Sequence, residues 1–398
     1  MRDVENPVVA WSGRGDKYTQ EEIDYIVEAI QNADPLTQGK YQQEFEDNFK
    51  MQMNVEHAFA TTNCTAALTL AAVLTKVGKG DEVILPAHTF AASAIPFART
   101  GAKLVWADID PETWTISPES IESLITKNTK VIVPVHLYGL MADMQPIVEL
   151  AKKHNIFVVE DAGQSPGASY NGQKAGSIGD FGCFSFHTHK NMTTLGEGGM
   201  LTLKDPDLAK LVPGLRHNGM RPYEIERSNY WQPAMGNVDF DWNNIWPFKF
   251  CMSEPQAAAG TVQLKRLDSV NTERKKRADK IKAACEIYPE LVFQKEPESY
   301  GHIYHLLPAR YDGVGNGKTR DDFIERMAFH HKVKVIVQYY PLYRYPMFQK
   351  AGFGDANCPN TDKLFDNMVS FPFQRWQSDE QIDYQIESII ETLEFLHK

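Results

Sequence analysis

The chain has 398 residues, of which 42% are apolar and 23% charged, which is the balance of an ordinary globular protein. It contains no apolar run of about 18 residues and does not start with a basic head and apolar stretch, so we expect a cytoplasmic protein without a membrane partner. The five cysteines are odd in number and widely spaced, which disfavours disulfides and a metal site. A net charge of −11 leaves no basic field for nucleic acid.

A helix is expected to begin after Thr19, because Glu22 follows at the spacing of a capping box. The next apolar residues recur at helical spacing: Ile23, Ile26, Val27 and Ile30. From about Glu56, short β-branched runs alternate with amphipathic segments. Strands are expected at 57–62, 82–87, 103–109, 131–136, 156–161 and 181–186. Helices are expected at 65–76, after Ser117 and at 144–154.

The expected strands are apolar on both faces and separated by helices, which is typical of a mostly parallel sheet covered by helices on both sides. Near Ser253 the pattern changes to one long helix. A strand at 303–311, a helix at 320–331 and a closing helix after Ser378 follow. We therefore predict an α/β fold in three parts: an N-terminal segment with its helix (1–30), a large α/β domain (31–265) and a smaller C-terminal α+β domain (266–398).

A single lysine, Lys190, lies between the strand that ends near Ser185 and the glycine-rich run 196–199. A lysine that attacks an aldehyde needs a lowered pKa and a position at the carboxyl end of a sheet, where α/β folds bind their ligands. The position of Lys190 meets the second need. Taken alone, however, a loop lysine is far more often a surface residue, so other residues must support the assignment.

Two further segments lie at the ends of expected strands. Asp161 ends the strand 156–161, where its carboxylate is placed either to pair with a pyridinium nitrogen or simply to cap the following segment. After the strand 57–62 a helix begins, and its first amides, near Cys64, Thr65 and Ala66, are suited to bind a phosphate. Thr65 is equally suited to be an ordinary helix cap. Ser185 adds a hydroxyl donor.

These blocks, in this order, resemble the DegT-type sugar aminotransferases within the fold type I pyridoxal-phosphate enzymes. The similarity runs over nearly the whole chain. It includes the segments PAHTFAASA, VVEDAGQSPGA, SFHTHKN with TTLGEGG, LRHNG, SEPQAAAGTVQLKRLD and YYPLY. The resemblance implies a mixed, mostly parallel sheet with a smaller C-terminal domain, pyridoxal 5'-phosphate (PLP) as the cofactor, and a homodimer with shared active sites.

The resemblance also implies roles for individual residues. Lys190 is the lysine that forms the Schiff base with the cofactor and moves the proton, Asp161 pairs with the pyridine nitrogen, and Gln164 contacts the ring hydroxyl. Phe90 stacks on the ring. The phosphate is held by Ser185 and, beside Cys64, by Thr65 and the amide of Ala66.

The chain departs from the family pattern in two segments, 247–252 and 338–343. In the segment 247–252, Lys249 replaces an asparagine that in the family reaches the phosphate of the neighbouring subunit. Gln338 and Tyr343 replace two histidines near the C-terminal domain. The aromatic-rich segment 221–246 is either a substrate or subunit-contact loop or a set of rings that fills a domain junction. His187 and His189 flank the lysine, and packing or hydrogen bonding is expected of His189 rather than catalysis.

The resemblance implies an aminotransferase that moves an amino group from an amino acid, most simply L-glutamate, to a keto or aldehyde sugar used for surface polysaccharide or lipopolysaccharide. The default acceptor is a nucleotide-linked deoxy sugar. The departures leave room for a free acidic sugar, the 3-deoxy-octulosonate that one branch of the family aminates at carbon 8. Two alternatives stay open: a PLP-dependent sugar dehydratase, and a regulatory protein that keeps the cofactor without catalysis. The intact Lys190, Asp161 and Gln164 speak against the regulatory protein.

Overall fold

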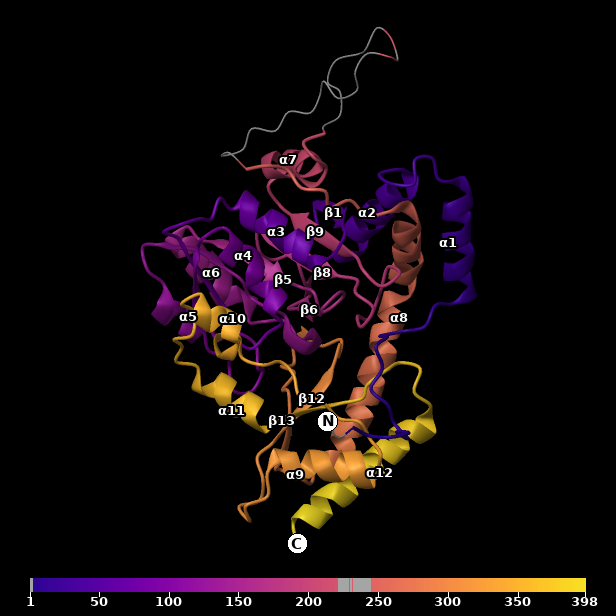
Figure 1. Ribbon diagram of the computed structural model, residues 1–398, viewed down its shortest axis with the longest axis vertical. Helices are drawn as coiled ribbons and strands as arrows, with labels where there is room; N and C mark the ends of the chain where they lie inside the picture. The colour runs from indigo at the N-terminus through magenta and orange to yellow at the C-terminus, as the bar shows by residue number, and fades with distance from the viewer. Residues whose placement is uncertain (1–2, 221–228, 230, 232–244) are drawn as a thin grey trace.

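The computed structural model describes residues 3–220, 229, 231 and 245–398. Its centre is a seven-stranded sheet in the order β1-β9-β8-β5-β4-β2-β3 (Figure 1). The strands are β1 (His57–Thr61), β9 (Gly199–Leu203), β8 (Phe181–Ser185), β5 (Phe157–Asp161), β4 (Thr129–Ile132), β2 (Glu82–Pro86) and β3 (Lys103–Ala107). The five strands from β8 to β3 are parallel, whereas β9 is antiparallel to both of its neighbours. The mixed, mostly parallel sheet is therefore confirmed.

Helices cover both faces of this sheet, as the sequence predicts. One face packs against α2 (Lys40–Met53), α5 (Pro118–Leu124), α6 (Met144–His154) and the first half of α8 (Glu254–Cys285). The other face packs against α3 (Cys64–Leu74), α4 (Ile95–Arg99) and α7 (Pro206–Arg216). Along β2, Ile84 joins the first apolar cluster while Val83 and Leu85 join the second, because successive side chains of a strand point to opposite faces.

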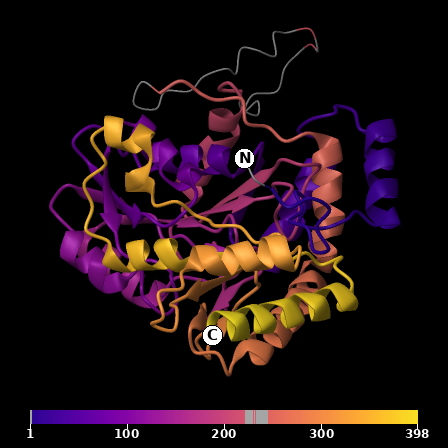
Figure 2. The same ribbon diagram turned by 60° about the horizontal axis from the view of Figure 1, so that its bottom comes forward.

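The long helix α8 runs from the large sheet into the C-terminal part of the molecule (Figure 1). There an antiparallel sheet of β10 (Leu291–Phe293), β12 (Leu307–Tyr311) and β13 (Met368–Phe371) shares an apolar cluster with α9 (Arg320–Glu325) and α12 (Asp379–Leu396). Figure 2 brings this part forward and shows α12 lying across it. Val9 joins the same cluster and pairs with Val333. The domain boundaries after residues 30 and 265 stay a prediction.

The remaining elements are short. A small sheet contains β11 (Tyr300–Gly301), β6 (Ser169–Tyr170) and β7 (Gln173–Lys174), and α10 (Pro346–Lys350) and α11 (Pro359–Asn367) precede β13. Among the described residues, no helix is both long and apolar enough to cross a membrane.

The first helix, α1 (Gln20–Asn32), begins at the expected capping box of Thr19 and Glu22. Its apolar stripe, however, does not face the core. Ile23 and Val27 are 44% exposed and Ile30 is 57% exposed, because α1 packs on α8 through the opposite side, where Ala29 is buried. Helical spacing therefore predicted the helix but not the face that the protein buries.

The elements that the sequence did not predict include α2, α7 and β9, and also the short α10, α11, β6, β7, β10, β11 and β13. Several expected elements end earlier or begin later than predicted. The strand at 303–311 begins only at Leu307, and the helix at 320–331 changes after Glu325 into a π-helical turn at 326–330. The strand expected at 131–136 ends at Ile132, and a single bridge from Val135 to Asp161 continues the pairing.

Candidate active site

A cavity of about 520 Å³ opens at the carboxyl ends of β5 and β8, beside the start of α3. This is the edge where parallel α/β sheets place their ligands. Seven residues that the resemblance assigns to the cofactor line this cavity: Cys64, Thr65, Phe90, Asp161, Gln164, Ser185 and Lys190. Ala66 and Lys249, which were also singled out, do not line it.

Lys190 lies in the loop between β8 and β9, half-buried, with its main-chain amide donating to the carbonyl of His187 (2.9 Å). Burial lowers the pKa of its amine, because the charged form loses hydration, while the nearby Cys64 and Asp161 partly oppose this change. Among the described residues, no side chain makes a hydrogen bond or ion pair with the amine. A lysine held in this way has a larger neutral, nucleophilic fraction than a surface lysine.

Asp161 is the last residue of β5 and is only 8% exposed. Its Oδ2 accepts a hydrogen bond from Ser93 Oγ (2.6 Å), and its Oδ1 accepts one from the amide of Gly163 (3.0 Å). The second bond is the cap that the sequence suggested. The first comes from a different element, and nothing in the sequence pattern pointed to Ser93. Together they hold the carboxylate at the wall of the cavity.

The start of α3 differs from the sequence-based expectation. Its N-cap is Asn63, whose Oδ1 accepts from the amide of Ala66 (2.8 Å), so Thr65 is not the cap. The amides of Cys64 and Thr65 have no acceptor among the described residues, and Thr65 lines the cavity. These two amides are the ones available to an anion at the helix N-terminus, whereas the Ala66 amide is already used. Asparagine is a favoured N-cap residue, so the sequence alone could have predicted Asn63 as the N-cap of this helix.

Gly199 explains part of the glycine-rich run after the lysine. A Cβ at this position would lie 2.4 Å from the main-chain carbon of Asn63 and 2.7 Å from the nitrogen of Cys64. Strand β9 therefore passes directly against the turn into α3 only because residue 199 has no side chain.

Gln164 and Phe90 lie on further walls. The Oε1 of Gln164 accepts from the main-chain amide of Tyr138 (2.8 Å), which fixes the side-chain amide and leaves its NH2 group for the cavity. Phe90 is 58% exposed, and its ring centroid lies 6.2 Å from that of Tyr339. Tyr339 belongs to the YYPLY segment and was not assigned a role from the sequence.

The two histidines beside the lysine also line the cavity. Their rings meet edge to face with centroids 4.9 Å apart, and the amide of His189 donates to Nδ1 of His187 (3.4 Å). Burial, followed by the charges of His187 and Lys190, lowers the pKa of His189. His189 is therefore mainly neutral near pH 7.

Lys249 is exposed and pairs through its main chain with His217 in an isolated bridge. It does not line the cavity of its own chain, and its contact with the cofactor of a partner subunit stays a prediction. Most of the aromatic segment 221–246 falls outside the described residues. Two of its rings that are described, Trp231 and Trp246, are 68% and 87% exposed.

The N-terminal segment 11–18, here called the strap, covers the lysine loop. Gly15 donates its amide to the carbonyl of Thr188 (2.7 Å), and Thr188 Oγ1 donates to the carbonyl of Gly13 (3.1 Å). The hydroxyl of Tyr18 accepts from the amide of Leu195 (2.8 Å). The strap therefore contacts the lysine loop on both sides of the lysine.

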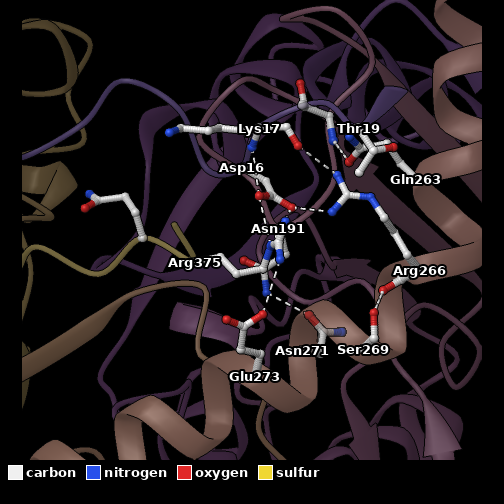
Figure 3. Close-up of polar contacts among 12 residues, drawn as sticks. Asp16, Lys17, Thr19, Asn191, Gln263, Arg266, Ser269, Asn271, Glu273 and Arg375 are labelled. Carbon is white, nitrogen blue, oxygen red and sulfur yellow. Dashed lines mark hydrogen bonds and ion pairs between the residues drawn. The ribbon is translucent and has the colours of Figure 1, made fainter. Parts of the chain in front are cut away.

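A buried carboxylate fastens the strap to the body of the protein. Asp16, 2% exposed, accepts hydrogen bonds from Arg266 Nη1 (2.6 Å) and from Arg375 Nε (2.9 Å to each oxygen), as Figure 3 shows. Arg266 also pairs with Glu22 of α1, and Arg375 with Glu273 of α8 (3.3 Å). Three segments that are distant in the sequence meet at this carboxylate, namely the strap, α8 and the segment after β13, and no local pattern predicted it.

A half-buried lysine and a buried carboxylate at the carboxyl edge of a mixed α/β sheet define a PLP-dependent transferase of fold type I. The free amides at the start of α3 suit the cofactor's phosphate, and the carboxylate held by Ser93 suits its ring nitrogen. The residues present therefore fit the cofactor.

Residues 17–390 match the model of the DegT/DnrJ/EryC1/StrS aminotransferase family, and the chain belongs to this family. It is 34% identical over 372 residues (93% of this chain, 94% of the relative) to the spore coat polysaccharide biosynthesis protein SpsC of Bacillus subtilis. It is 42% identical over 305 residues (76% and 78%) to the GDP-perosamine synthase of Caulobacter vibrioides. The enzyme is thus a PLP-dependent sugar aminotransferase, as the resemblance implied.

Solved structures agree with this fold. The aminotransferase from Psychrobacter cryohalolentis superposes with a TM-score of 0.89 at 29% identity, covering 98% of this chain and 100% of that chain. Spr1654 from Streptococcus pneumoniae in its PMP-form gives a TM-score of 0.87 at 28% identity, again over 98% and 100%. The fold type I architecture is confirmed.

Proposed function

We propose that the enzyme transfers the amino group of L-glutamate to the keto group of a nucleotide-linked deoxy sugar, in the cytoplasm, for a surface polysaccharide or lipopolysaccharide. The observation that carries the aminotransferase chemistry is Lys190, an amine with a lowered pKa beside Asp161 in one cavity. The choice of acceptor is supported by relatives. One is the GDP-perosamine synthase above; another, from Acidithiobacillus ferrooxidans, is named UDP-N-acetyl-3-dehydro-alpha-D-glucosamine 3-aminotransferase and is 32% identical over 328 residues (82% of each chain).

Each residue of the ring site has one task in this proposal. When bound, PLP supplies a ring that withdraws the electrons left on the substrate carbon after its proton departs. Lys190 holds the cofactor between turnovers and carries the proton to and from that carbon. Asp161 keeps the ring nitrogen protonated, Gln164 donates its amide to the ring hydroxyl, and Phe90 covers one face of the ring.

The phosphate site uses the free amides of Cys64 and Thr65 with the hydroxyls of Thr65 and Ser185. The amide of Ala66 contributes only by sharing its present bond with Asn63. Lys249 of a second copy adds a cation, so the enzyme works as a homodimer with shared sites.

Borohydride labelling tests the assignment of the lysine. The purified enzyme should be yellow, and sodium borohydride should bleach the colour while fixing the cofactor to the peptide that contains Lys190. Label on a different lysine would remove the central assignment. In a separate experiment, unreduced enzyme whose cofactor has taken the amino group from L-glutamate should be mixed with a panel of keto sugars, nucleotide-linked and free.

The acceptor panel separates the remaining candidates. Conversion of a nucleotide-linked keto sugar supports the proposal, while conversion only of a free 3-deoxy-octulosonate derivative would assign the acidic sugar instead. Loss of a hydroxyl without formation of 2-oxoglutarate would identify a dehydratase. No conversion of any sugar, with the cofactor still bound, would favour a regulatory protein.

A further inference from the structure

A second, smaller cavity of about 80 Å³ adjoins the cofactor cavity. The two cavities share four lining residues: His189, His305, Gln338 and Tyr339. The other walls of the small cavity come from the strap, from α8 and from the segment after β13. It therefore extends from the catalytic lysine's cavity toward the strap, and nothing in the assigned reaction so far uses it.

The small cavity is lined by two cations and by no carboxylate. Arg14 of the strap and Arg274 of α8 line it, and its lining includes neither aspartate nor glutamate. Arg274 is only 3% exposed. Its Nε donates to the carbonyl of Tyr304 (2.7 Å), and its Nη2 donates to the carbonyls of His305 (2.7 Å) and Phe373 (3.1 Å).

Those three acceptors are uncharged, and within the described residues no carboxylate forms an ion pair with Arg274. Burial lowers its pKa to about 10, with Asp16 partly opposing the change, so the guanidinium is still charged at neutral pH. Buried charges are normally paired, so an unpaired guanidinium in the wall of a cavity indicates an anionic ligand.

His305 stands between the two cavities and is 3% exposed. Burial, followed by the charges of Lys190 and Arg274, keeps its pKa well below the ordinary value, so the ring is neutral. Its Nδ1 has no hydrogen-bond partner among the described residues. The small cavity is therefore lined by an arginine without an ion-pair partner among the described residues and by a neutral histidine that also lines the lysine's cavity.

We propose that this small cavity binds a substrate carboxylate through Arg14 and Arg274, while the reacting carbon of the same substrate lies beside Lys190. The cavity of about 80 Å³ is larger than the roughly 10–15 Å³ that one water molecule needs, so it has room for a carboxylate group. Guanidinium groups bind carboxylates with two parallel hydrogen bonds. The inference rests on the proposed function, because amino transfer needs an amino-acid donor.

Two substrates offer this chemistry: the amino-acid donor and a free keto-acid sugar. The main variants are made at Arg14, because its side chain is exposed and its replacement should not disturb the fold. Arg274 is less suitable, because it also donates hydrogen bonds to three main-chain carbonyls. The variants are Arg14→Gln and Arg14→Lys, with Arg274→Lys as a second site. Lys17→Gln is the matched control, since Lys17 is a strap cation whose ammonium lies over Trp376 and does not line the cavity.

The first measurement is equilibrium binding of acetate and 2-oxoglutarate to the holoenzyme by calorimetry, with acetamide as the uncharged probe. We expect Arg14→Gln to weaken carboxylate binding by about tenfold, Arg14→Lys to restore part of it, and Lys17→Gln to change nothing. Equal binding by wild type, Arg14→Gln and Arg274→Lys would overturn the proposal. An equal loss of acetate and acetamide binding would also overturn it.

The second measurement identifies the source of the carboxylate by single-turnover kinetics of the two half-reactions. Slower reaction with L-glutamate, with an unchanged nucleotide-linked sugar half-reaction, assigns the subsite to the amino donor. Slower reaction only with a free keto-acid sugar assigns it to the acceptor. If no nucleotide-linked sugar reacts but carboxylate binding still depends on Arg14, the proposed acceptor fails while the subsite stands.

Discussion

At the scale of single residues, the site holds two ionisable side chains, Lys190 and Asp161, that differ in their hydrogen-bonding partners. Lys190 is half-buried without a hydrogen-bonding partner among the described residues, and burial lowers its pKa. Asp161 is more deeply buried, but two donors stabilise its charged form. The lysine is thereby prepared to lose its proton, while the aspartate is held in place at the wall of the cavity.

The lowered pKa of Lys190 predicts a pH-dependent effect on stability. Below its folded pKa the amine is charged in both states, and its lost hydration destabilises the native state of the cofactor-free enzyme. Between that pKa and the ordinary lysine value of about 10.4 the unfolded chain binds more protons, so wild-type stability rises with pH. Lys190→Ala should therefore melt at or above the wild-type temperature at pH 7. Calorimetry from pH 7 to pH 10 should show that advantage shrinking; a constant or growing difference would contradict this account.

Lys190→Ala should also bind PLP without turning over, because the residue serves proton transfer rather than the core. Cofactor binding is measured by absorbance and turnover by formation of 2-oxoglutarate. An active variant would remove Lys190 from the mechanism.

Asp161→Asn should retain the cofactor but lower kcat by several orders of magnitude, because an amide does not keep the ring nitrogen protonated. Ser93→Ala is the comparison variant: it removes one hydrogen bond but keeps the carboxylate, so its kcat should fall far less. The absorbance of the bound cofactor reports the ring's protonation independently of turnover. A near wild-type kcat in Asp161→Asn would mean that Asp161 is only a cap.

At the scale of elements, the strap is the component that ties the start of the chain to the lysine loop. A Cβ on Gly15 would lie 2.1 Å from the carbonyl oxygen of Lys190, so the strap passes in direct contact with the lysine's main chain. Asp16 holds this position through two arginines from α8 and from the segment before α12. The strap also carries Arg14 into the small cavity.

Asp16→Asn should lower the free energy of unfolding by about 1.5–3 kcal/mol, the range for a hydrogen bond to a charged group. The loss is smaller than for a fully buried pair, because the side chains of Arg266 and Arg375 are 18% and 27% exposed and can be hydrated. Denaturant unfolding measures the change. Asp207→Asn, which removes a fully exposed pair with Lys210, is the control and should change stability little. Equal losses of stability in both variants would mean that the contact of Asp16 with Arg266 and Arg375 stabilises the protein no more than a surface ion pair does.

At the scale of the whole molecule, two exposed surface features are candidates for contact with a second subunit. The apolar stripe of α1 is exposed, and Lys249 is exposed outside the cavity of its own chain. Both observations agree with the proposed homodimer, in which each site takes residues from both chains.

Subunit exchange tests that arrangement. Lys190→Ala and Lys249→Ala should each be inactive or nearly so, and mixing them under conditions of exchange should restore activity. In a mixed dimer, one site carries both changes and the other carries neither if Lys249 serves the partner. Recovery should approach one active site per mixed dimer. If Lys249 instead serves its own chain, every site carries one change and mixing restores nothing; a fully active monomer would refute the shared site as well.

The sequence by itself determined the class of fold and the centre of the chemistry. Strand and helix periodicity gave a mostly parallel sheet, because residues buried on both faces of a strand must all be apolar. The order of the blocks around Lys190 and Asp161 resembles that of the DegT-type aminotransferases, and this resemblance implied the cofactor chemistry. Asp161 ends one strand, and Lys190 follows the end of another at the same edge of the sheet. Such signals are local, and each spans only a few residues.

Only the tertiary structure decided which partners those residues have. Ser93 reaches Asp161 from 68 positions away, and Asp16 meets Arg375 across 359 positions, so no window of sequence contains either pair. Strand β9, whose glycine-rich start resembles a loop, is held by pairing with β1 and β8 on both sides. The exposed face of α1 follows from its packing on α8. Long-range packing and strand pairing determine these contacts. Local periodicity indicates only that one face of an element is apolar, and not which part of the protein will pack against it.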